Sequence, residues 1–365
     1  MALQVVEIPN VGGGVNDYVT AENIMPSEAR DTSRNIRGQA DAYLPRGGYT
    51  TFADVLTGGG VVAFGAYLRN LETNDRLAMV QDDNLFTIDP SSATSWTNAY
   101  TFTGGTQTEM DLVAYRDWLF MFNGVDKPFR VEGGTVTQDF TAPASVSTAN
   151  FLPAFGDVYG SSLFVSGVPQ APNTIFISKA SSSATPEDVY DFSGALSSFG
   201  NANEILLQSR VTAIRKLSTA VCIFTVDGAI YVPGLKEFGS SVTFDVQPIG
   251  GASGAVSQKS TVVVENDIYY LTPQKEIKSI KRGFSDTLSV ITTPMSTRIQ
   301  KFLTEEIDDD LSSAFAYYDQ TNKLYKLHLK AKGGTENSIT IVGDVNELDE
   351  QGVPSWFIDD ARPFT

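Results

Sequence analysis

The sequence has very few of the side chains from which most catalytic and metal sites are built. Among 365 residues there is one cysteine, Cys222, and one histidine, His328. A single cysteine excludes an internal disulfide, and the two residues together leave little material for a His/Cys zinc site or a Ser-His-Asp triad. Cys222 lies in the apolar run AVCIFTV, which favours a buried structural thiol over a nucleophile. His328 lies in the alternating stretch LYKLHLK, and we expect it on the more exposed side of a strand.

Charged residues are also scarce, and basic residues are fewer than acidic ones. They make up 19% of the chain, with 26 Lys and Arg against 43 Asp and Glu, so that the formal net charge is −17. Nucleic-acid binders usually cluster Lys and Arg, because each neutralised phosphate releases counterions. The field of this chain therefore repels DNA, RNA and anionic lipid.

Long apolar runs are missing as well. No segment approaches the roughly 18 apolar residues that a membrane helix needs. The first residues, MALQVVEIPN, lack the basic region and apolar core of a signal peptide. We expect a protein made in the cytoplasm, without a membrane span.

What the sequence does contain is a repeat. A short alternating apolar strand is followed by a polar corner, a stronger strand, a turn with Gly, Asn or Asp, and a third strand. Examples are DLVAYRDWLFMFNG and VTAIRKLSTAVCIFTVDG. In these units Asn123-Gly124 and Asp227-Gly228 supply the positive φ that tight hairpins favour. The pattern occurs six times, beginning near Val61, Asp111, Ala154, Val211, Ser260 and Ser313.

The spacing of the repeat predicts the fold class. The six starts are separated by 50, 43, 57, 49 and 53 residues, and the blades of a β-propeller recur every ~40–50 residues with four antiparallel strands each. We therefore predict an all-β propeller of about six blades, with one or two short peripheral helices. Residues 58–365 form the propeller. Residues 1–57 form a docking segment, and part of 1–20 or 48–57 is expected to complete the blade that contains SWFIDD.

Helix is predicted in two places. In TPMSTRIQKFLTEEI, residues 293–307, four apolar residues fall at i, i+4, i+7 and i+8 and form one stripe; they are Met295, Ile299, Phe302 and Leu303. Thr293 before Pro294 resembles a helix cap. A second short helix is expected within residues 25–35.

Candidate chemistry is limited to acidic residues and glycines. Adjacent acids occur at 82–83, 305–306, 308–310 and 359–360, and they are typical of solvated charge runs. The IDDDL cluster lacks the alternating ligands and the glycine of an EF-hand, and the glycine pairs lack the trailing Lys-Ser/Thr of a P-loop. We expect no catalytic residues, no metal site and no cofactor.

Basic residues gather in two segments. Residues 29–49 hold four arginines, which we predict to be assembly contacts: Arg30, Arg34, Arg37 and Arg46. The second segment, KEIKSIKRG, holds Lys275, Lys278, Lys281 and Arg282. In a chain of net charge −17, such groups are suited to an acidic patch on a neighbouring subunit, where they fix the register of the contact.

Three parts of the chain together resemble a known family. They are the entry AYLPRGGYTTF; the middle, from VTAIRKL through VQPIGGASGAVSQKSTVVVENDIYYLT; and the end, from PMSTRIQKFL through AFAYYDQTNKLYKL to GDVNELDEQGVPSWFIDD. In order and pattern they are similar to bacteriophage tail hub and nozzle proteins, including the packaged-DNA stabilisation proteins of short-tailed phages. Members of that family often have proline where Gly47 or Gly48 stands here, and many are longer.

The resemblance implies a structural virion protein rather than an enzyme. It implies a homo-oligomeric ring in the tail, with a hexamer favoured, between the portal and adaptor side and the distal tail proteins. DNA passes through such a ring without sequence-specific binding, and acidic walls favour sliding. Two alternatives stay open. One is a carbohydrate-binding or glycosidase-type propeller, for which Trp96, Trp118 and Trp356 are few and scattered. The other is a baseplate or tail scaffold protein of another virion type.

Overall fold

The computed structural model describes most of the chain. The described residues are 36–39, 42–45, 61–67, 76–89, 95–193 apart from 104, 106, 108, 133 and 183, 204–249 apart from 218, 219, 229, 239 and 240, 253–282, and 290–360 apart from 351. They fall into two compact units. The first unit is Thr50–Gln258, and the second joins Met1–Tyr49 to Lys259–Phe364.

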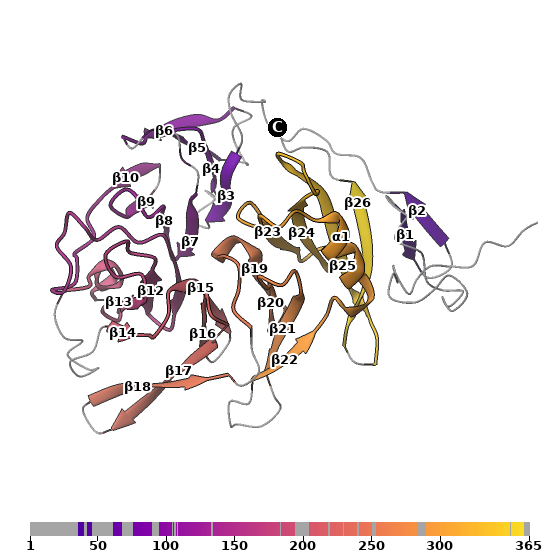
Figure 1. The fold of residues 1–365 in the computed structure, drawn as a ribbon. Helices are drawn as coiled ribbons and strands as arrows, with labels where there is room; N and C mark the ends of the chain where they lie inside the picture. The colour runs from indigo at the N-terminus through magenta and orange to yellow at the C-terminus, as the bar shows by residue number, and fades with distance from the viewer. Residues whose placement is uncertain are drawn as a thin grey trace, which may run out of the picture. The chain divides into compact units, whose positions relative to one another are not determined.

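The first unit contains four antiparallel sheets of four strands each (Figure 1). We number the sheets in chain order. Sheet 1 consists of β3 (Val61–Tyr67), β4 (Arg76–Gln81), β5 (Asn84–Ile88) and β6 (Thr97–Thr101). Sheet 2 consists of β7 (Asp111–Tyr115), β8 (Trp118–Phe122), β9 (Phe129–Glu132) and β10 (Thr135–Thr137). Sheet 3 consists of β11 (Phe155–Tyr159), β12 (Ser162–Ser166), β13 (Thr174–Ile177) and β14 (Glu204–Leu206). Sheet 4 consists of β15 (Val211–Leu217), β16 (Ala220–Thr225), β17 (Ile230–Phe238) and β18 (Ser241–Pro248).

The second unit contains two further sheets of four strands and one of two strands. Sheet 5 consists of β19 (Thr261–Val264), β20 (Asp267–Leu271), β21 (Ile277–Arg282) and β22 (Val290–Pro294). Sheet 6 consists of β23 (Phe315–Asp319), β24 (Leu324–Lys330), β25 (Asn337–Leu348) and β26 (Pro354–Asp360). The two-stranded sheet pairs β1 (Ile36–Gln39) with β2 (Ala42–Pro45). One α-helix, α1 (Gln300–Glu306), precedes sheet 6, and short 3-10 helices occupy Pro186–Tyr190, Gln258–Ser260 and Thr297–Ile299.

The six sheets begin where the sequence repeat predicts. Their first strands start at Val61, Asp111, Phe155, Val211, Thr261 and Phe315, within two residues of the predicted starts. In every sheet the four strands are in chain order and antiparallel. The predicted all-β propeller, with about six blades expected, is confirmed as a fold class.

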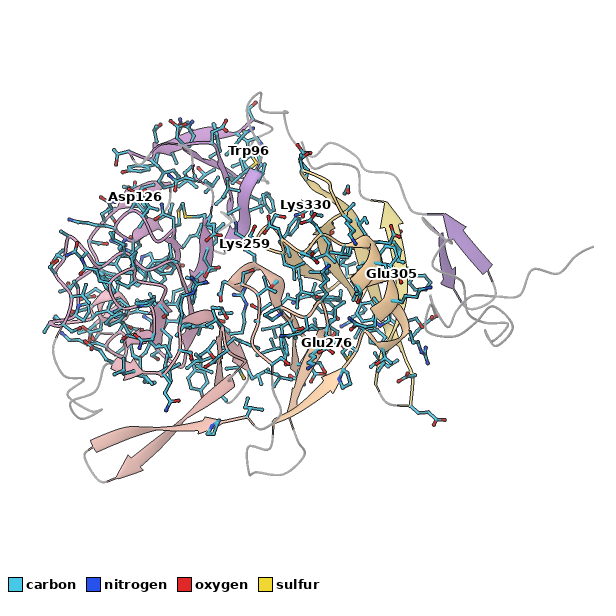
Figure 2. All side chains as sticks on the ribbon, in the orientation of Figure 1. Trp96, Asp126, Lys259, Glu276, Glu305 and Lys330 are labelled. Atoms are coloured by element: carbon cyan, nitrogen blue, oxygen red, sulfur yellow. The ribbon has the colours of Figure 1, made fainter. Side chains whose placement is uncertain are left out.

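Both faces of the middle strands of sheets 2 and 3 are buried, because each of these sheets packs between two others of its unit. In β8 the sequence WLFMF is buried throughout. Leu119 and Met121 join a core with residues of sheet 1, whereas Phe120 and Phe122 join a core with residues of sheet 3. A third core joins sheets 3 and 4. Figure 2 shows side chains filling the spaces between the sheets of this unit. Successive first strands also contact each other, β3 with β7, β7 with β11 and β11 with β15.

Within each unit, every four-stranded sheet is joined to an adjacent link by a hydrogen bond on one side. In each sheet, the loop between the second and third strands forms a hydrogen bond with a segment that links two consecutive sheets. We call these hydrogen bonds the loop-to-link bonds. Their N···O distances lie between 2.7 and 3.0 Å: Phe102 N to Asp83 O, Gly124 N to Pro153 O, Leu207 N to Asn173 O, Val226 N to Arg210 O, Lys275 Nζ to Ile307 O and Lys332 N to Glu306 O. In each case a loop at one end of a sheet is thereby held to the link beside it.

The predicted tight hairpins are only partly correct. Gly124 and Gly228 do have positive φ, 74° and 93°. However, β8 ends at Phe122 and β9 begins at Phe129, so the loop is longer than a two-residue hairpin. The two-residue turns lie between other strands, where Arg116 and Glu265 adopt φ of 52° and 54°. The twist of a two-residue hairpin requires positive φ at the turn, and residues other than glycine can adopt it. A search for glycine in the sequence therefore did not find these turns.

The helix prediction is correct in its buried stripe and wrong in its start. Thr293 and Pro294 end β22, and helical structure begins at Thr297. The ladder with β21 continues to the pair Lys278 and Pro294, so pairing with the sheet overrides the cap-like sequence. All four residues of the predicted stripe are buried, whereas Glu305 on the opposite side of α1 is exposed (Figure 2).

Some expectations concern residues outside the described ranges. These are the helix within 25–35 and the closing strand from 1–20 or 48–57. The sheet that contains SWFIDD takes its four strands from residues 315–360. Within the described ranges, no helix is both long enough and apolar enough to cross a bilayer.

Gly254 gives a test of the link after sheet 4. A Cβ at this position would lie 2.0 Å from Thr225 O and 3.0 Å from Gly228 N. Gly254→Ala therefore forces the link away from the end of β16, and we expect it to lower the free energy of unfolding by about 3 kcal/mol. The measurement is urea denaturation followed by circular dichroism.

Gly160→Ala is the matched control. Gly160 has φ of +62° and open space around its Cα, so the alanine there costs only about 1 kcal/mol for the left-handed backbone. Equal stability of the two variants would show that the link after sheet 4 is not closely packed.

Candidate interaction surface

Of the four arginines predicted to be assembly contacts, the structure describes only Arg37. Arg37 is in β1, opposite Leu44 of β2. Arg30, Arg34 and Arg46 are outside the described residues. Their role as assembly contacts stays a prediction.

The second basic segment is largely committed to contacts within its own unit. Lys275 is buried, and its Nζ donates to Ile307 O and to Asp309 Oδ1, both at 2.7 Å. Lys278 pairs with Glu276 at 2.9 Å. Lys281 and Arg282 lie in β21. The expectation that this segment meets a neighbouring subunit is therefore wrong for Lys275, because burial takes its ammonium group away from any partner chain.

The acidic run 308–310 is neutralised by lysines. Lys275 pairs with Asp309, and Lys330 lies 3.5 Å from Asp308 and 3.0 Å from Asp310. Backbone N–H groups of Asp310 and Ser312 also donate to the side chains of this run. These donors hold the pKa values of the three carboxyls below their usual range. Among the described residues, no group of three or more His, Cys, Asp or Glu is arranged to hold a metal ion.

A buried polar cluster joins the first strands of sheets 2, 3 and 4. Its centre is Gln258, whose Nε2 donates to Asp111 Oδ2 at 3.1 Å and to Gly156 O at 3.2 Å. Gln258 Oε1 accepts from Ile214 N at 2.8 Å, and Arg215 donates to Gln258 O at 2.7 Å. Burial raises the pKa of Asp111, although the charge of Arg215 opposes the shift. The cluster was not foreseen, because its members are 43 to 147 residues apart in the sequence.

This cluster is saturated by its internal hydrogen bonds. Asp111 Oδ2 accepts from Gly156 N at 3.0 Å as well as from Gln258. The neighbouring carboxylate of Asp157 accepts from Val158 N at 2.8 Å and from Lys216 N at 3.0 Å. Both carboxylates thus serve as acceptors for backbone groups of adjacent first strands. They fix the spacing of three sheets.

A second unforeseen cluster surrounds Arg130. Its guanidinium lies over the rings of Trp118 and Tyr190, 5.1 and 4.9 Å from their centroids. It also forms a bidentate pair with Asp139, at 2.6 and 3.3 Å, and contacts Glu132 at 2.6 Å. Planar stacking combined with a fork of donors is characteristic of arginine. The cluster holds the segment after β10 and the 3-10 helix Pro186–Tyr190 against sheet 2.

The three tryptophans do not converge. Trp118 packs with Arg130, and Trp356 is fully buried, with Nε1 donating to Met295 O at 2.8 Å. Trp96 lies edge-on to the half-exposed Phe64, with centroids 6.3 Å apart, at the margin of sheet 1 (Figure 2). This arrangement gives no shared platform for a sugar.

The two rare residues of the chain are both buried. Cys222 is fully buried, as predicted, and burial raises its thiol pKa to about 12. The expected exposure of His328 is wrong: the side chain is 2% exposed. Its ring stacks on Phe315 and Tyr317, and its Nδ1 lies 2.9 Å from Thr340 Oγ1. Aromatic neighbours on the adjacent strand cover the ring, which alternation within LYKLHLK did not indicate.

Several large apolar side chains are exposed on the side of the first unit that carries the loop-to-link bonds. Val125 and Val226, in loops between second and third strands, are 65% and 45% exposed. Leu206, at the end of β14, is 74% exposed. Exposed apolar groups on one side of a protein are typical of a contact surface.

Sheet 4 carries a projecting hairpin. Strands β17 and β18 pair at eight positions, from Tyr231 with Pro248 to Phe238 with Ser241. In contrast, β16 and β17 pair at only two, Ile223 with Tyr231 and Phe224 with Ile230. Figure 1 shows the two strands continuing well past β15 and β16. We call residues 230–248 the arm.

Comparisons with known proteins support the fold and give no family. No protein-family model and no curated protein matches the chain. Among solved structures, the β-propeller domain of Cps50 (Swd1) from Myceliophteria thermophila superposes with a TM-score of 0.51 at 9% identity, covering 86% of this chain and 90% of that one. YCF48 from Cyanidioschyzon merolae has a TM-score of 0.44 at 8% identity, covering 84% and 87%. The C-terminal WD40 domain of Sif2 has 0.45 at 8%, covering 82% and 72%. The chain has a β-propeller fold.

The buried histidine gives a test by pH. Burial lowers the pKa of His328 from 6.5 to about 4. The unfolded chain therefore binds a proton more readily than the folded one, and His328 destabilises the fold as pH falls from about 6.5 to about 4. The shift corresponds to about 3 kcal/mol. We expect His328→Phe to lose that part of the pH dependence.

The measurement is the free energy of unfolding of both proteins at several pH values between 7 and 4. Carboxylates titrate in the same range, so only the difference between wild type and variant reports the histidine. A difference that stays constant with pH would show that His328 is not buried as a neutral ring.

Proposed function

We propose that this chain is a structural protein of a bacteriophage tail, of the hub or nozzle kind. Copies of it assemble into a ring, with a hexamer favoured, which extends the DNA channel and helps to retain and pass DNA. The proposal includes the absence of enzymatic activity and a place in the tail of the virion. Other tail proteins are its neighbours on the portal and distal sides.

The observation that carries this proposal is that potentially reactive side chains make structural contacts. Several interior side chains of reactive type are engaged in contacts between sheets or links, as for Asp111, Lys275 and Trp118. A body of packed sheets whose interior polar side chains join strands and links is suited to building a wall. The propeller fold is also the one that the family resemblance implies.

Charge supports the same proposal. With 26 basic and 43 acidic residues, the formal net charge is −17. A channel must let DNA slide without holding it, and acidic walls repel phosphate over about a Debye length. The arginine-rich segment 29–49 is the exception in sign, and we assign it to contacts between subunits, where opposite charge gives specificity.

The assembly prediction concerns Arg34 and Arg37. Replacing both with Glu reverses charge in the docking segment, and we expect the variant to stay folded but to lose the ring. Particle mass by light scattering and negative-stain electron microscopy measure assembly, and circular dichroism reports the fold.

The control replaces Lys127 and Lys301 with Glu. Both lysines are exposed, so this variant has the same change in net charge at other places and should assemble normally. Wild-type protein that remains a monomer at every concentration would overturn the proposed function. If the double arginine variant assembles like the wild type, the docking segment is not a contact between subunits and that part of the proposal is wrong.

A further inference from the structure

The arm presents strand edges that no described residue pairs. From Val232 onward β17 has no partner in β16, and β18 is the last strand of sheet 4. A hairpin of two strands is only marginally stable by itself in water. Its unpaired N–H and C=O groups are also a template for another strand. An arm of this length is therefore incomplete as it stands.

The two edges of the arm differ in sequence. Soluble proteins protect free edges with Pro and Lys, and β17 contains both, at Pro233 and Lys236. β18 reads SVTFDVQP; it has no lysine, its one proline is the last residue, Pro248, and the seven residues before it include several strand-forming side chains. The edge of β18 is thus left open for pairing.

The chain contains a second incomplete ribbon, the pair β1 and β2. It too has only two strands, and in its own unit β1 contacts β26 without joining the ladder of sheet 6. Residues 29–49 have four arginines and two aspartates, a net +2, whereas the arm has one lysine and two acidic residues, a net −1. The segment 29–49, which contains the ribbon, and the arm are opposite in net charge; the ribbon itself, residues 36–45, holds one arginine and one aspartate and is neutral.

We propose that the edge of β18 in one copy of the chain pairs with the β1–β2 ribbon of a second copy. The product is a sheet of four strands, the number found in each of the six larger sheets. This inference rests on the proposed function, because it names the surface on which the docking segment of the ring binds.

Such a contact determines the symmetry of the assembly. The two surfaces that meet are different parts of the chain, so the interface is heterologous. When two copies pair, one still has a free ribbon and the other a free arm, so head-to-tail contacts of this kind close into a ring or continue as a filament. A symmetric dimer would instead use one surface twice.

Proline substitutions test which edge pairs. Lys236 lies opposite Thr243, and Leu235 lies opposite Phe244. Hydrogen-bonded and non-hydrogen-bonded pairs alternate along an antiparallel ladder, so one of these two pairs directs both N–H groups away from the hairpin. At that pair, proline in β18 removes a donor from the open edge, while proline in β17 leaves that edge unchanged.

We expect proline at Thr243 or at Phe244 to weaken assembly at least tenfold in dissociation constant. The proline at the opposite β17 position, Lys236 or Leu235, is the matched control and should assemble nearly as wild type. Analytical ultracentrifugation measures assembly, and circular dichroism confirms the fold. If β17 and β18 prolines have equal effects at both pairs, the β18 edge is not the contact.

Cysteine crosslinking identifies the partner strand. The single native thiol, Cys222, is fully buried, so introduced cysteines report without interference. One tagged protein carries Thr243→Cys, and differently tagged proteins carry cysteine in turn at Ala42, Tyr43 or Leu44. We expect an interchain disulfide in one of the mixtures and none from either protein alone.

Three results would overturn the inference. The first is the absence of a crosslink in every mixture. The second is a crosslink of the Thr243→Cys protein with itself. The third is a crosslink within one chain, seen when a monomeric protein carries both cysteines. If the wild-type protein and all the arm variants form rings, the arm contact is refuted but the proposed function is not. A wild-type monomer refutes the function.

Discussion

The need to pair every buried backbone group is the constraint on which the rest of this structure depends. Sheets 2 and 3 pack against their neighbours through both faces, and such packing alone leaves a sheet free to slide. The loop-to-link bonds remove that freedom, since a displaced sheet would leave amides such as those of Gly124 and Leu207 without their acceptors. Leaving a buried donor unpaired costs about 1–3 kcal/mol, so the more buried of these contacts, such as that of Leu207, contribute most to the register.

The same constraint explains the use of charged residues in the interior. Gln258 and Asp111 pair with backbone groups of neighbouring first strands, and Lys275 reaches the carbonyl of Ile307. A side chain that completes the backbone pairing of another sheet is not available for catalysis. In this protein such polar groups of the interior hold strands and links of one unit in register.

Among the described residues, the arm is a long element whose outer edges have no partner strand. Its eight-position ladder is attached to sheet 4 at two positions. Elsewhere in the described residues, outer strands end close to the sheet that carries them, as β10 and β14 do with three residues each. Pairing between copies would extend to the assembly the same rule that orders the sheets within the chain.

The sequence by itself determined the strands, their repeat and the fold class. Strand alternation is a local property, and burial of both faces leaves continuous apolar runs such as WLFMF and AVCIFT, so the six starts could be predicted within two residues. Tertiary structure decided the rest. Pairing with β21 moved the start of the helix, and rings of Phe315 and Tyr317 buried His328. Contacts between residues more than forty positions apart built the Gln258 cluster, because such contacts depend on the path of the whole chain.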